Sequence, residues 1–191
     1  MELLKEPGWI EVIVGPMFAG KSEELIRRLR RLDYAKKKYL VFKPAIDDRY
    51  SKDEVVSHLK NRAKAIPLKK ANDILKYVKD DIEVVGIDEF QFFDEEIISV
   101  CEELANRGVR VICAGLDNDF RGIPFPISAN MLARAEFVTK LTAICVKCGA
   151  PATMTQRLVN GKPASIHDAV VLVGGTESYE PRCRHCHEIA K

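Results

Sequence analysis

The segment from Gly15 to Ser22 has the residue types and spacing of a phosphate-binding loop. It reads Gly-Pro-Met-Phe-Ala-Gly-Lys-Ser and matches the pattern G-x-x-x-x-G-K-[ST]. Such glycines let backbone N–H groups surround phosphate oxygens at the start of a helix, where the aligned peptide dipoles favour negative charge. We expect Lys21 to contact the outer phosphates and Ser22 to place its hydroxyl on Mg²⁺. The residues predicted to bind the phosphate chain are Gly15, Pro16, Met17, Phe18, Ala19, Gly20, Lys21 and Ser22.

Two carboxylates follow an apolar stretch further along the chain. Residues 84–89 read Val-Val-Gly-Ile-Asp-Glu, which is typical of the acidic strand that completes a nucleoside triphosphate site. Asp88 is expected to face the magnesium ion. Glu89 is expected to point to the other side of the strand and to orient the nucleophile or accept its proton, although a solvated strand-end carboxylate is the alternative. The two segments together indicate ATP or GTP bound with magnesium.

Four of the six cysteines form two Cys-x-x-Cys pairs near the end of the chain. This spacing predicts a structural zinc ribbon in which four thiolates close a tetrahedron. A redox-active Cys-x-x-Cys is the alternative, but two pairs flanking one hairpin fit a closed metal site better. His185 and His187 lie close enough to compete as ligands, and we rank them below Cys186. The predicted zinc ligands are Cys145, Cys148, Cys183 and Cys186.

Strand and helix patterns alternate through the first part of the chain and provide the elements that position these groups. The apolar residues of the segment 21–34 recur at helical spacing, whereas its arginines occupy the other positions. These arginines could bind polyanions, but we expect them to form a solvated helix face. Shorter helices are predicted after Asp73 and after Asp94 as capping residues, the second running to residue 106 or 107 and ending at Gly108. The alternation predicts an α/β fold with a parallel sheet covered on both faces and ligands beyond the carboxyl ends of its strands. The predicted strands are 9–14, 39–42, 84–87, 109–114 and, more weakly, 137–141.

The character of the sequence changes near Lys140, where the paired cysteines begin. Asn160-Gly161 predicts a tight hairpin turn, and Gly174-Gly175 interrupts a run of valines. We therefore expect an α/β nucleotide-binding domain over residues 1–140 and a small zinc-binding domain over residues 141–191.

Composition fits this organisation and excludes other classes of protein. The 191 residues, 47% hydrophobic and 30% charged, suit one globular domain with a small appendage. Thirty basic and 28 acidic residues leave a net charge of +2, which predicts no nucleic-acid partner. The beginning of the chain lacks a signal-peptide pattern and no later run has the apolar length of a membrane span, so we expect a cytoplasmic protein. Cys101 and Cys113 lie in apolar stretches and are expected in the core.

Three segments and the cysteine pairs after them closely resemble the type II thymidine kinases. The segments are residues 15–22, the Asp-Glu-Phe-Gln-Phe-Phe sequence at 88–93, and the Gly-Leu-Asp-Asn-Asp-Phe-Arg-Gly-Ile-Pro-Phe sequence at 115–125. Their order and spacing match the family over about residues 10–186. The resemblance implies transfer of the γ-phosphoryl group of ATP to the 5′-hydroxyl of thymidine in pyrimidine salvage, with Glu89 as the catalytic base. It also implies a homotetramer and feedback inhibition by the end product dTTP.

The same resemblance assigns residues to both substrates. Aromatic and apolar walls would stack on a flat pyrimidine, and the backbone of a lid loop near residues 155–179 would pair with its polar edge. A methyl-sized space beside C5 would accept thymine, whereas a purine would collide. One departure is Phe90, which is often smaller in the family, so an altered wall of the site is expected there. The implied nucleotide contacts are Asp47, Asp48, Arg49, Asp88 and Gln91, and the implied nucleoside contacts are Met17, Phe92, Leu116, Phe120, Phe125, Thr155, Val170, Val171, Leu172, Val173, Gly174 and Tyr179.

Two other activities remain open at this point. A deoxycytidine kinase or broad pyrimidine nucleoside kinase would use the same elements. A different class is an ATPase whose zinc ribbon binds nucleic acid, with turnover that rises with DNA or RNA and depends steeply on salt. The near-neutral charge and the absence of a basic, aromatic-rich ribbon sequence disfavour this second alternative.

Overall fold

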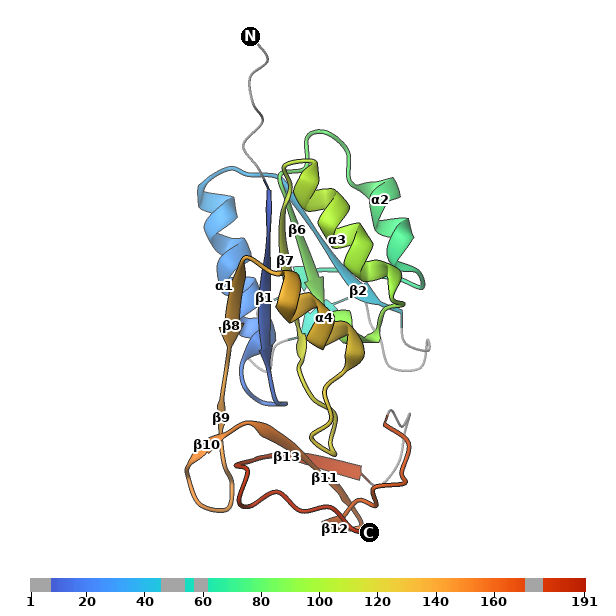
Figure 1. Cartoon of the computed structure of the whole chain (residues 1–191). Helices are drawn as coiled ribbons and strands as arrows, with labels where there is room; N and C mark the ends of the chain where they lie inside the picture. Colours follow the sequence, from blue (N-terminus) through green and yellow to red (C-terminus); the bar gives the residue numbers. More distant parts are fainter. Residues whose placement is uncertain (1–7, 46–53, 57–61, 171–176) are drawn as a thin grey trace.

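A parallel sheet of six strands forms the centre of the protein in the computed structural model, which describes residues 8–45, 54–56, 62–170 and 177–191 (Figure 1). The strand order is β5-β2-β6-β7-β1-β8, and every pairing within this sheet is parallel. The predicted α/β class is therefore confirmed. The strands are β1 (Trp9–Gly15), β2 (Tyr39–Pro44), β5 (Ile66–Leu68), β6 (Val84–Asp88), β7 (Arg110–Leu116) and β8 (Phe137–Lys140).

Helices cover both faces of this sheet, as Figure 1 shows. Neighbouring residues of β1 illustrate why: Ile13 packs against α1 (Lys21–Tyr34), whereas Val12 belongs to the core on the side of α3 (Glu96–Asn106) and α4 (Pro126–Arg134). Successive strand side chains point to opposite faces, so an apolar strand can fill two cores at once. Cys101 and Cys113 are fully buried in the core on the side of α3 and α4, as predicted.

The end of α3 lies where the glycine predicts it. Gly108 has φ 86° and its N–H donates to the Ala105 carbonyl at 2.9 Å. The Val109 N–H donates to the Leu104 carbonyl at 3.0 Å. These paired bonds around a left-handed glycine satisfy carbonyls that the helix itself leaves without partners, which ends the helix at this point.

The predicted capping roles of Asp73 and Asp94 are wrong. A 3₁₀ turn precedes the one-turn helix α2 (Ile74–Tyr77), so Asp73 already has helical dihedral angles, and its carboxylate pairs with Lys76 at 2.6 Å. A side-chain N-cap requires an extended residue at that position. The Asp94 carboxylate instead accepts the N–H of Ala71 at 3.3 Å, and it therefore connects the segment before α3 to the 3₁₀ turn before α2.

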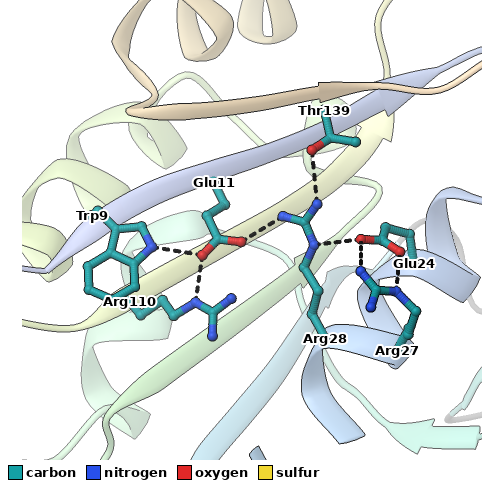
Figure 2. Close-up of polar contacts among 7 residues, drawn as sticks. All are labelled: Trp9, Glu11, Glu24, Arg27, Arg28, Arg110 and Thr139. Atoms are coloured by element: carbon teal, nitrogen blue, oxygen red, sulfur yellow. Dashed lines mark hydrogen bonds and ion pairs between the residues drawn. The ribbon is translucent and has the colours of Figure 1, made fainter. Parts of the chain in front are cut away.

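A buried ion-pair network fixes α1 to three strands (Figure 2). The Glu11 carboxylate on β1 accepts hydrogen bonds from Trp9 Nε1 at 2.7 Å, Arg110 Nε at 2.6 Å and Arg28 Nη1 at 2.6 Å. Arg28 also donates to the Thr139 hydroxyl of β8 at 2.9 Å. Burial alone would raise the pKa of Glu11, but the bonds from Arg110, Trp9 and Arg28 outweigh it and lower that pKa. Arg28 is thus part of the scaffold that positions α1, contrary to the prediction of a solvated face.

The C-terminal part is antiparallel. Its strands are β9 (Ala143–Ile144), β10 (Pro151–Ala152), β11 (Met154–Val159), β12 (Lys162–Pro163) and β13 (Glu177–Arg182), with β11 between β12 and β13. The predicted Asn160-Gly161 turn is confirmed, since φ is 50° and 75° at the two residues and β11 pairs directly with β12. The architecture changes after β8, and the division into two domains near residue 140 stays a prediction.

A short antiparallel pair, β3 (Glu54–Val56) and β4 (Arg62–Lys64), lies outside the main sheet. Among the residues described, none of the helices has the length and apolar character needed to cross a membrane.

Candidate functional site

The glycine-rich segment connects the end of β1 to the start of α1, as the motif requires. A Cβ atom on Gly15 would lie 2.5 Å from the Leu141 carbonyl oxygen, so only glycine fits there. Gly20 precedes α1 with φ 81°, a conformation that glycine adopts without strain. Phe18 also has a positive φ of 64°. The loop therefore depends on two glycines for its path, and it presents the beginning of α1 at the carboxyl edge of the sheet.

Lys21 is held inside this loop. The residue is 8% exposed, and its Nζ donates to the Pro16 carbonyl at 2.7 Å. Burial lowers the pKa of Lys21, while the nearby charges of Glu89 and Asp88 oppose that shift. A cation in this position is suited to bind an anion at the helix start.

Ser22 and Asp88, the two predicted magnesium ligands, lie next to each other. The Ser22 hydroxyl donates to Asp88 Oδ2 at 3.2 Å. Burial, and then the adjacent charge of Glu89, raise the pKa of Asp88 to about 7. A divalent cation would favour the ionised carboxylate and find two oxygen donors here, which are the ligand atoms that magnesium prefers.

Gln91 fixes the carboxylate of Glu89. Its Nε2 donates to Glu89 Oε2 at 2.6 Å, and its Oε1 accepts the backbone N–H of Leu116 at 3.1 Å. Both ends of the amide are therefore used within the protein, and its predicted contact with the nucleotide stays a prediction. Glu89 follows the last residue of β6 and has a left-handed conformation with φ 51°. This conformation sets the direction of its side chain, and not the alternation of side chains along a strand that the sequence predicted. Phe90 is fully buried in the core and does not form a wall of the site.

Gly115 leaves the space that Gln91 occupies. A Cβ atom there would lie 2.1 Å from Gln91 Oε1 and 2.8 Å from a ring carbon of Phe90. Gly115→Ala is therefore expected to lower the free energy of unfolding by about 1–3 kcal/mol, as overpacking does. Gly86→Ala on the adjacent strand is the matched control, because its Cβ would make ordinary contacts at 3.5 Å with Leu25 and Leu29. Urea denaturation measures both, and equal losses would contradict the role given to Gly115.

The loop from Asp117 to Phe125 is a folded turn between β7 and α4. Asp119 Oδ1 accepts the N–H groups of Arg121 at 2.8 Å and Ile123 at 3.0 Å, and the Phe125 N–H donates to the Asp117 carbonyl at 3.0 Å. Figure 1 shows this loop reaching from the sheet to the strands of the C-terminal part. The Phe92 and Phe125 rings pack edge to face with centroids 5.7 Å apart. Two of the predicted nucleoside contacts are therefore neighbours at the edge of the sheet.

Contacts between three distant segments join the two parts of the protein. The Met17 N–H in the phosphate loop donates to the Thr155 hydroxyl on β11 at 3.0 Å. His187 Nε2 donates to the Phe120 carbonyl at 2.8 Å. Within the C-terminal part, Tyr179 on β13 lies opposite Arg157 on β11. The structure thus brings Met17, Phe120 and Thr155 to one region.

Of the remaining predicted nucleotide and nucleoside contacts, most lie outside the described residues. Val170 is described, and it follows Ala169 in a bend. The remaining predicted contacts lie outside the described residues: Asp47, Asp48, Arg49, Val171, Leu172, Val173 and Gly174.

The four paired cysteines converge at one point. Their sulfur atoms all lie within 4.8 Å of one another, with Cys148 Sγ 3.6 Å from Cys183 Sγ. Four sulfurs at about 2.3 Å from a zinc ion are separated by about 3.8 Å in a tetrahedron, so the cluster fits zinc. Burial would raise the pKa of Cys145, but backbone N–H groups, that of Cys183 first, outweigh it and lower the pKa to about 6. His187 is directed to Phe120 instead, which agrees with its lower ranking as a ligand.

Sequence reasoning missed two residues at this site. Asp117 is buried and its Oδ2 lies 2.9 Å from Lys140 Nζ. Its position after an apolar strand was a usable signal. Arg157 contacts Phe120 from the C-terminal part, and no local pattern marks it. His187, considered above only as a zinc ligand, contacts the Phe120 carbonyl instead.

The parallel sheet, the glycine loop between β1 and α1, and the acidic end of β6 define an α/β protein of the phosphate-loop class, joined to a ribbon whose cysteines suit zinc. A protein-family model described as thymidine kinase matches residues 8–187. The chain therefore belongs to the thymidine kinase family, as the resemblance predicts, and it is a phosphotransferase.

Proposed function

We propose that the protein transfers the γ-phosphoryl group of ATP to the 5′-hydroxyl of thymidine, giving dTMP and ADP for pyrimidine salvage. The observation that carries this proposal is the placement of Glu89, fixed by Gln91, directly after the Asp88–Ser22 pair. A base, a metal site and a phosphate loop at one sheet edge are what a kinase for a hydroxyl acceptor needs. Membership of the thymidine kinase family supports thymidine and ATP as the substrates.

In the proposed reaction this chain supplies alignment, charge neutralisation and a proton acceptor. The loop N–H groups and Lys21 bind the phosphates, while Ser22 and Asp88 hold the magnesium ion that accompanies ATP. Glu89 accepts the proton of the 5′-hydroxyl as the new O5′–P bond forms and the bond to the ADP oxygen breaks. Because the transition state of phosphoryl transfer is loose, positioning and electrostatics supply most of the rate enhancement. Arg49 is proposed as an additional cation.

The nucleoside is proposed to lie between the loop after β7 and the C-terminal part. Phe92 and Phe125, already in edge-to-face contact, and Phe120 would enclose the base. The remaining proposed contacts are Met17, Leu116, Thr155, Tyr179 and the segment 170–174. The hydrogen bond from Met17 to Thr155 supports a site shared by the phosphate loop and β11.

Zinc is proposed as a structural cofactor that orders the ribbon. We also propose a cytoplasmic homotetramer inhibited by dTTP, as the family resemblance implies. The exposed Phe137 and Val138 on the edge strand β8, 58% and 49% accessible, support association between copies of the chain.

Steady-state assays with several acceptors test this function. Purified protein with ATP and Mg²⁺ is expected to convert thymidine to dTMP, to act more weakly on deoxycytidine, and to leave purine nucleosides unchanged, because a purine exceeds the proposed pocket. Chelation of magnesium should stop the reaction. Equal activity on purine nucleosides would contradict the pocket, and ATP hydrolysis stimulated by DNA or RNA would favour the nucleic-acid alternative.

A further inference from the structure

Arg157 is a fully buried arginine that connects three segments. It lies on β11 with 0% relative exposure. Its guanidinium carbon lies 5.0 Å from the centroid of the Phe120 ring, in the loop after β7. Its Nη1 donates to the Ala169 carbonyl at 2.6 Å, directly before Val170. One side chain therefore sets the separation between the loop after β7 and the segment that begins at Ala169.

The chemistry of this contact requires arginine. A guanidinium is planar, so it can stack on an aromatic ring while its N–H groups donate in the same plane. A lysine ammonium is a compact point charge and cannot hold both geometries at once. Burying a charged group costs free energy. If Arg157 served only to fill space, a leucine or methionine at this position would make the folded protein more stable.

Phe120 is held from a second side as well. It is 5% exposed, and its carbonyl accepts the hydrogen bond from His187 Nε2. The carboxylate of Asp119, the residue before it, accepts the N–H groups of Arg121 and Ile123 after it. With the backbone restrained by these bonds, the remaining freedom of Phe120 is the rotation of its ring, and the Arg157 guanidinium restricts that rotation.

We propose that Arg157 is a positioning residue for the nucleoside, and this rests on the proposed function. It orients the Phe120 ring, the proposed wall of the base site, and the carbonyl of Ala169, which leads into the proposed base-edge segment at Val170. Arg157 touches the nucleoside side of the site, whereas the phosphate side is formed by Lys21, Ser22 and Asp88. Its loss should therefore weaken nucleoside binding more than ATP binding or phosphoryl transfer.

The test compares Arg157→Lys and Arg157→Met with the wild-type enzyme. The KM for thymidine is expected to rise about 10-fold or more, the loss expected from a cation–π contact and a charged hydrogen bond. The KM for ATP should stay within about 2-fold and kcat within about 3-fold, because the phosphate site is unchanged. Lysine should not rescue the KM for thymidine, since charge without planarity does not restore the contact.

Arg182→Lys is the matched control. Arg182 is another buried arginine of the same sheet, but it donates to the Cys186 carbonyl at 2.8 Å and pairs with Glu180. In the zinc-loaded protein its substitution is expected to lower the melting temperature while leaving the KM for thymidine within about 2-fold, because Arg182 contacts the metal side of the ribbon.

Amide hydrogen exchange of the ligand-free protein gives a readout independent of catalysis. Exchange in residues 118–125 and 164–169 is expected to accelerate in Arg157→Lys while β1 and β6 stay protected. An unchanged KM for thymidine, or equal increases in the KM values for thymidine and ATP, would overturn the proposal for Arg157. Absence of thymidine phosphorylation by the wild-type enzyme would instead refute the proposed function, so the two failures are distinguishable.

Discussion

Glu89→Gln is expected to lower kcat for thymidine phosphorylation by about 100-fold or more, the range that a positioned general base supplies. Glutamine has the size of glutamate but cannot accept the proton of the 5′-hydroxyl. Its amide can still contact Gln91, and the hydrogen bond between Ser22 and Asp88 does not involve Glu89. The KM values for ATP and thymidine should therefore change by less than about 3-fold. Steady-state kinetics with saturating ATP measure the effect.

Glu103→Gln is the control for this substitution. Glu103 lies on α3, exposed to solvent and paired with Arg107 at the helix surface. Exposed pairs of this kind contribute about 0–1 kcal/mol, so kcat and stability should stay close to those of the wild-type enzyme. If kcat of both Glu89→Gln and Glu103→Gln stays within about 3-fold of the wild-type value, Glu89 is not the base.

Cys183→Ser is expected to abolish zinc binding and unfold the C-terminal ribbon. Among the described residues, the buried apolar core beside the paired cysteines consists of Ala143, Cys145, Ala152 and Cys183. So small a core cannot offset the entropy of ordering the chain, whereas structural zinc contributes about 10–16 kcal/mol in small domains. Loss of the ribbon removes the contact of Thr155 with Met17, so thymidine phosphorylation should fall with it. Metal analysis, circular dichroism and activity report the three effects.

Cys101→Ala separates zinc binding from the general effect of losing a cysteine. Cys101 lies in the main core with its sulfur 3.8 Å from that of Cys113. Its truncation removes one buried atom and is expected to cost about 1–2 kcal/mol without changing the zinc content. One zinc per chain in Cys183→Ser, or full activity after prolonged chelation of the wild-type enzyme, would contradict the structural role of the metal.

Local patterns predicted the elements that carry the phosphate site. The apolar run before Gly15 predicts β1, and the helical spacing after Lys21 predicts α1 with the same bounds as the structure. Gly108 predicts the end of α3 because the left-handed conformation is nearly free only for glycine. The capping roles of Asp73 and Asp94 could not be predicted, because an aspartate can accept from several nearby donors and the packing of α2 near α3 selected among them.

The sequence by itself determined the glycine loop, the acidic end of β6, the cysteine pairs and the alternation that produces a parallel sheet. Each depends on spacing over a few residues, which the covalent chain and the periods of helix and strand already dictate. The tertiary structure alone decided which groups hold these motifs in place: Gln91 between Glu89 and Leu116, Thr155 on Met17, and Arg157 between Phe120 and Ala169. These contacts join segments far apart along the chain, and a side chain reaches such a partner only after the sheet and the ribbon have packed.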